Sequence, residues 1–165
     1  MPHTFSPPVQ SGIDILSKER PELVKGAKIR PMGWLGRTFL PQAKGVMNPL
    51  TGTVSLNEAQ MAGDAPQDVA DTVLHELTHR QQRERSGPLR SLMNIMTPQG
   101  PYGQRPDELE AFQAEADRRM QMGRPGAYGT PHFETPTQET YGDIRLPSES
   151  GGRKRQALAS LRAVR

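Results

Sequence analysis

The pentad His75-Glu76-Leu77-Thr78-His79 constrains this chain more than any other segment. In an α-helix, residues four apart lie on the same face with Cβ atoms about 6 Å apart, so both imidazoles can point the same way. Two imidazoles at this spacing can bind one Zn²⁺, and the glutamate between them can reach a water molecule on the metal. The pentad therefore predicts a helix that carries His75 and His79 as zinc ligands and Glu76 as a general base.

The residues around the pentad favour a helix over 68–85. Asp64 is placed to cap its start, Pro66 suits the first turn, and Gln67 stands three residues after Asp64, as in a capping box. The Gly87-Pro88 pair ends the pattern. One apolar face is expected from four residues: Val69, Val73, Leu74 and Leu77.

A second helix is predicted over 106–122, and it offers a third metal ligand. Glu108, Glu110 and Glu115 are the candidates. Glu110 is preferred because Ala111 and Ala114 follow it, and small residues allow two helices to approach closely. Glu108 and Glu115 are expected to face solvent, although Glu115 can instead hydrogen-bond a ligand histidine and so orient it. The buried stripe of this helix is expected to contain Leu109, Phe112, Ala116 and Met120.

Short apolar runs separated by Gly, Pro and Asn predict a small, antiparallel sheet before the pentad. The expected strands are 28–30, 37–40, 45–47 and 53–56, and the last two form a hairpin around the turn 48–52. Trp34 is interpreted as a core or edge anchor. Strands followed by helices give an α+β fold, with the hairpin packed on the pentad helix and the Glu-bearing helix.

A chain of 165 residues fits one domain, and 16 glycines and 16 prolines indicate long irregular segments around a small core. We expect an extended arm at 1–11 with a short helix at 13–24, a core at 25–123, and a Gly/Pro-rich extension with a basic tail at 124–165. Cysteine is absent, which excludes disulfides and thiolate metal sites. Any metal must therefore be held by histidine and carboxylate groups, a set that suits Zn²⁺.

His75–His79 followed by the Glu110-Ala111 pair resembles the gluzincin arrangement of metallopeptidases. The shortness of the chain is similar to the minigluzincins and to zincin-like domains of bacteria and phages. The resemblance covers residues 40–120 and includes the hairpin before the pentad. It implies a zinc metallopeptidase in which metal-activated water attacks a peptide bond. The substrate peptide is then expected to lie beside residues 53–56, by strand addition.

A gluzincin-type site also needs a group that stabilises the oxyanion of the transition state. Tyr102, Tyr128, His132 and Tyr141 are all candidates, and their spacing does not select one of them. Glu115 remains a candidate for orienting a ligand histidine.

An alternative interpretation is a catalytically inactive zincin-fold component of a phage virion or another assembly, which uses its terminal arms to bind neighbours. The tail at 153–165 is basic, but it lacks the interleaved aromatic residues that favour single-stranded nucleic acid, so nucleic-acid binding is a weak expectation. No apolar run approaches a membrane span and the N-terminus lacks the features of a signal peptide, so we expect a cytoplasmic or virion-associated protein without a membrane partner.

Overall fold

The computed structural model describes residues 4–97 and 102–124. These residues all belong to the first of two units, which spans Met1–His132. The predictions for the Gly/Pro-rich extension, the basic tail and the assembly role of that tail lie outside the described residues, as do Tyr128, His132 and Tyr141.

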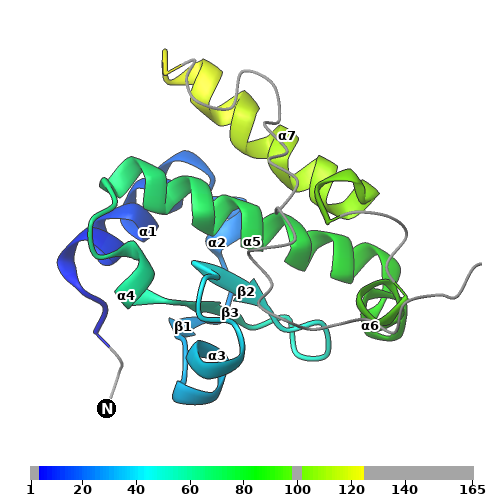
Figure 1. The fold of residues 1–165 in the computed structure, drawn as a ribbon. Helices are drawn as coiled ribbons and strands as arrows, with labels where there is room; N and C mark the ends of the chain where they lie inside the picture. The colour runs from blue at the N-terminus through cyan, green and yellow to red at the C-terminus, as the bar shows by residue number, and fades with distance from the viewer. Residues whose placement is uncertain (1–3, 98–101, 125–165) are drawn as a thin grey trace, which may run out of the picture. The chain divides into compact units, whose positions relative to one another are not determined.

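The fold is mixed α+β, as the sequence predicts, with many helices around a small three-stranded sheet (Figure 1). The elements in chain order are α1 (Pro7–Glu19), α2 (Pro21–Val24), β1 (Ile29–Pro31), α3 (Trp34–Phe39), β2 (Gly45–Met47), β3 (Val54–Leu56), α4 (Glu58–Met61), α5 (Pro66–Ser86), α6 (Pro88–Met96), the 3₁₀ turn η1 (Tyr102–Gln104) and α7 (Pro106–Gln121).

The sheet has the strand order β1-β3-β2, so β3 is central and β2 forms an edge beside α5. β2 and β3 pair antiparallel with Gly45 opposite Leu56, which confirms the predicted hairpin. β1 pairs with β3 in parallel, so the expectation of a purely antiparallel sheet was wrong. A strand was predicted at 37–40, but these residues lie in or next to α3. This helix lies in the connection that leads from β1 through β2 to β3, and the connection lets β1 and β3 run in the same direction.

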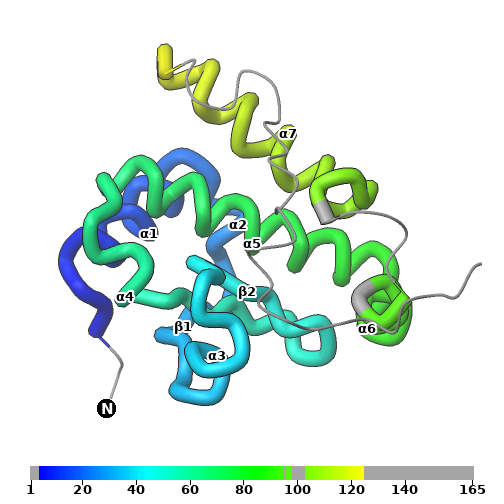
Figure 2. The backbone as a smooth tube through the Cα atoms, in the orientation of Figure 1, coloured from blue at the N-terminus to red at the C-terminus, as the bar shows by residue number. Residues whose placement is uncertain are grey.

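The core lies where α1 and α5 pack together and over the sheet (Figure 2). The extended arm predicted at 1–11 is wrong from Pro7 onward, because Pro7 and Pro8 open α1 and Val9, Ile13 and Leu16 form its buried face. Prolines in a first helical turn cost no hydrogen bond. Gly12 lets α1 approach α5, since a Cβ there would lie 2.5 Å from the Val69 Cβ atom.

Several side chains differ from their predicted environments. Asp64 does not cap α5, whose N-cap is Ala65; it forms an ion pair with Lys44 at 2.8 Å instead. Trp34 is 68% exposed on α3, so it anchors neither core nor edge. On α7 the expected apolar stripe is wrong, because Leu109 and Met120 are exposed. The buried residues of α7 are Glu108, Ala111 and Arg118.

Among the described residues, every helix is too short or too polar to cross a membrane.

Candidate metal centre

Helix α5 buries most of the pentad. Leu77 and Thr78 face the protein interior, His75 and Glu76 are each only 7% exposed, and His79 is partly buried. The two imidazoles are one turn apart, and their ring centroids lie 4.7 Å from each other. The helix predicted from the pentad thus places both rings on one side, as the i, i+4 spacing requires.

A carboxylate from α7 completes a three-residue cluster with these rings. The Glu108 Oε2 atom lies 3.3 Å from His75 Nε2 and 3.4 Å from His79 Nε2, and the two Nε2 atoms are 3.1 Å apart. Three ligands around tetrahedral zinc, with bonds near 2.1 Å, stand about 3.4 Å from one another. His75, His79 and Glu108 are therefore spaced as a zinc ion needs, and they form a possible metal-binding group.

The sequence-based choice of Glu110 as the third ligand is corrected by this arrangement. Glu110 is exposed; one carboxylate oxygen pairs with Arg85 and the other accepts a hydrogen bond from Gln82. Ala111 is fully buried, as expected for a small residue where two helices approach each other. Glu108 stands three residues before Ala111 and shares its face, whereas Glu110 is turned about 100° away.

Each imidazole of the cluster is held at its other nitrogen, Nδ1. Glu115 Oε1 lies 2.7 Å from His75 Nδ1, and Gln82 Oε1 lies 2.8 Å from His79 Nδ1. The structure thus shows the contact anticipated for Glu115, whereas no sequence pattern pointed to Gln82. The Phe112 ring meets His75 edge-on, with centroids 5.0 Å apart. Such outer contacts orient metal-binding imidazoles, because a bonded Nδ1–H leaves the Nε2 lone pair for the metal.

The charges of the cluster alter the pKa values of its members. Burial alone would lower the pKa of His75, but the carboxylates of Glu108 and Glu115 outweigh burial and raise it to about 10. Burial also opposes the charged form of His79, and Glu108 again raises its pKa. Burial raises the pKa of Glu76, partly offset by the two histidines. The carboxylates therefore favour a positive charge at the imidazoles, which either protons or a metal ion can supply.

Glu76 lies against the edge strand β2. A Cβ on Gly45 would come within 2.7 Å of the Glu76 Cγ atom, so only glycine fits there without displacement, and the Met47 backbone hydrogen-bonds the Glu76 carboxylate. Lys44 O accepts from Asn57 N, so by the alternation of an antiparallel ladder the Lys44 backbone faces β3 and that of Gly45 faces outward.

The predicted substrate position beside residues 53–56 is wrong, because Val54–Leu56 form the central strand of the sheet. β3 has strand partners on both sides, β1 and β2, and has no free edge for a peptide. The strand edge that faces Glu76 belongs to β2.

A pocket of about 420 Å³ opens beside the cluster. Its wall includes the chain from Ala43 to Gly45, His75 and Glu76 of α5, and Phe112 and Arg119 of α7. Lys44 and Arg119 are the cationic side chains that line it, and both are paired with aspartates. Of the predicted oxyanion candidates, Tyr102 begins η1 but its side chain is not described.

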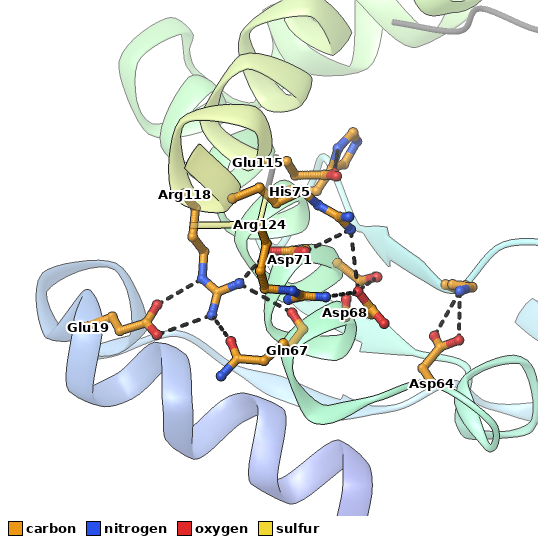
Figure 3. Close-up of polar contacts among 12 residues, drawn as sticks. Glu19, Asp64, Gln67, Asp68, Asp71, His75, Glu115, Arg118 and Arg124 are labelled. Carbon is orange, nitrogen blue, oxygen red and sulfur yellow. Dashed lines mark hydrogen bonds and ion pairs between the residues drawn. The ribbon is translucent and has the colours of Figure 1, made fainter. Parts of the chain in front are cut away.

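The far end of the α5–α7 contact is held by ion pairs (Figure 3). Arg118 is 5% exposed and binds Asp71 and Glu19, with a further hydrogen bond to Gln67 Oε1 at 2.6 Å. Arg119 adds a second contact to Asp71, at 2.7 Å. These contacts fix the position of α7, and therefore of Glu108, relative to the two histidines.

Comparison of the chain with known protein families, curated proteins and solved structures found no match. What supports a metal centre is therefore the geometry of the residues themselves.

Proposed function

We propose that this protein is a zinc-dependent metallopeptidase of gluzincin type. The observation that carries the proposal is the convergence of two imidazole nitrogens and one carboxylate oxygen at 3.1–3.4 Å, with Glu76 on the same helix. A catalytic zinc site has three protein ligands and keeps one position for water, and the set His75, His79 and Glu108 meets that description.

Zinc held by these three residues would lower the pKa of a bound water to about 7 and polarise a substrate carbonyl. Glu76 is not one of the three, and it lines the pocket beside His75. Its carboxylate would accept the proton of the attacking water as the C–O bond forms, and would then deliver that proton to the amine nitrogen as the C–N bond breaks. Burial raises the pKa of Glu76 and therefore favours proton acceptance.

We infer that the substrate is an extended peptide that lies along β2. The outward backbone groups of Gly45 can pair with such a peptide by strand addition, and the absent side chain leaves its backbone close to Glu76. Gly45, His75 and Phe112 all line the pocket of about 420 Å³, so it offers room for a substrate side chain.

Glu76→Gln tests the assigned base. The variant should bind zinc like the wild type and hydrolyse an unfolded protein substrate at least about 10²-fold more slowly, because the proton acceptor is lost. Glu84→Gln is the matched control, since Glu84 lies on the same helix, exposed and paired with Arg80. Undiminished hydrolysis by the Glu76 variant would exclude the mechanism. A wild-type protein that binds zinc and cleaves no peptide in a diverse library would favour the scaffold alternative.

A further inference from the structure

We propose that Gln82 is a positioning residue that fixes the ring of His79 and ties it to the turn of α7 that carries Glu108. The inference rests on the proposed metal centre, and it assigns a role to a side chain that no sequence pattern indicated.

Gln82 bridges the two helices that supply the ligands. Its Oε1 atom lies 2.8 Å from His79 Nδ1, while its Nε2 atom donates to the Asp107 carbonyl at 2.8 Å and to Glu110 Oε2 at 3.1 Å. Asp107 directly precedes Glu108 in the first turn of α7. One amide group therefore contacts a ligand histidine at one end and the backbone next to the third ligand at the other.

The bridge also determines which nitrogen of His79 carries hydrogen. A carbonyl oxygen and a carboxylate can only accept hydrogen bonds, so the NH₂ group of Gln82 must face Asp107 and Glu110. The amide oxygen then faces His79, and Nδ1 must be the donor. In the neutral ring that binds a metal, this leaves the Nε2 lone pair directed at His75 Nε2 and Glu108, where the metal would lie. The pairing of Glu110 with Arg85 holds its carboxylate in this accepting position.

The two histidines differ in the charge of their outer partners. His75 has a carboxylate, Glu115, whereas His79 has a neutral amide. Glu76, Glu108 and Glu115 already place three carboxylates around the two rings. An amide orients the second imidazole without a fourth negative charge, so the role of Gln82 is orientation and not charge balance.

The test compares Gln82→Met, Gln82→Glu and Gln81→Met in the full chain. Methionine keeps the length of the side chain and removes all three hydrogen bonds of the Gln82 amide. Glutamate keeps the acceptor for His79, and Gln81 is an exposed neighbour on the same helix. Zinc titration against a competing chelator should show affinity about 10- to 100-fold weaker for Gln82→Met, the usual effect of losing an outer ligand contact. Gln82→Glu should stay within about tenfold of the wild type, and Gln81→Met should match it.

A second readout separates orientation from general loosening of the fold. In the zinc-bound protein, ¹⁵N NMR of the histidine rings should show a His79 Nδ1–H proton protected from solvent exchange. That proton should persist in Gln82→Glu and disappear in Gln82→Met, with His75 unchanged.

The possible failures are distinguishable. Equal zinc affinity in Gln82→Met and Gln81→Met overturns the inference about Gln82 alone. Loss of affinity with the His79 proton still protected overturns it too. A wild-type chain that binds no zinc overturns both the metal centre and this inference. Zinc affinities that follow the expected order in a protein without hydrolytic activity leave Gln82 in its role and remove only the peptidase.

Discussion

The contact between α5 and α7 has two ends, and they differ in how their buried charges are balanced. At one end, Arg118 and Arg119 of α7 meet Asp71 of α5, and Glu19 of α1 joins them. At the other end, His75, His79 and Glu108 direct three electron-pair donors at one another within 3.4 Å. The same helix pair thus contains a network with its own cations and a cluster of donors that could hold a cation from solution.

The difference separates a structural role from a chemical one. Arg118 cannot lose its proton at ordinary pH, so the ion-pair end is permanently satisfied and holds the helices in place. The donor end is satisfied by protons or by a metal ion, which exchange with solvent. A rigid anchor at one end therefore positions an exchangeable site at the other.

The largest expected effect comes from breaking the ion-pair end. Arg118→Ala leaves Asp71, whose side chain is 2% exposed, and Glu19 without their main partner. Removing one member of a buried charge pair lowers the free energy of unfolding by about 3–5 kcal/mol. Denaturant unfolding with and without zinc should show this loss in both conditions. Arg124→Ala, which removes a partly exposed pair with Asp68, is the control and should cost less than about 1 kcal/mol.

The next effect comes from the donor end. Glu108→Gln removes the anionic ligand while keeping its shape, so zinc binding should be lost. At zinc concentrations 100-fold above its dissociation constant, the wild type gains about 2.7 kcal/mol of stability. Thermal unfolding of the variant should show none of this gain at the same concentration. A full zinc-induced shift in Glu108→Gln would exclude Glu108 as a ligand.

Protons should compete with zinc for the imidazole of His75 at the donor end of the α5–α7 contact. The pKa of His75 is raised from 6.5 to about 10 in the metal-free fold, so its contribution to stability is complete below pH 6.5 and is lost as pH rises toward 10. Between pH 6.5 and 8 the loss is about 2 kcal/mol, at 1.4 kcal/mol per pH unit. Denaturant unfolding in the presence of a chelator measures it.

His75→Gln removes the titrating ring and should flatten this part of the pH profile. Zinc must displace the His75 proton, so its affinity should rise over the same interval. Metal-free stability that increases from pH 6.5 to 8 in the wild type, relative to His75→Gln, would contradict the assigned pKa shift.

The parts of the fold that follow from short-range pattern could be predicted from the sequence. The i, i+4 histidines and the apolar residues beside them gave the pentad helix, and alternating short runs with an intervening turn gave the hairpin. Part of helix α3 was mistaken for a strand because an apolar run was taken as a sign of burial. The apolar side chains of α3 are in fact exposed: Trp34 is 68% and Phe39 is 76% exposed. The start of α1 was missed because its prolines suggested an extended arm.

The residues of the candidate site could be predicted except for the face of α7 that meets α5. His75, His79 and the contact of Glu115 followed from spacing and chemistry, whereas the choice between Glu108 and Glu110 depends on which face of α7 meets α5. Fully buried Ala111 marks that face, and Glu108, Glu115 and Arg118 lie on it at spacings of three, four and seven residues from Ala111. An apolar stripe was expected there, but the contact face is polar because it carries the charges that the site and its anchor need.

The smallest expected effect distinguishes the two glutamates directly. Glu110→Gln removes an exposed ion pair with Arg85 and keeps an acceptor oxygen for Gln82, so zinc affinity should change by less than about 1 kcal/mol. Zinc titration of Glu110→Gln beside Glu108→Gln measures both under the same conditions. Retained binding in the first and lost binding in the second places the ligand on the buried face of α7. The reverse order would restore the choice of Glu110 and require α7 to rotate about its axis, because residues two apart on a helix point about 200° apart.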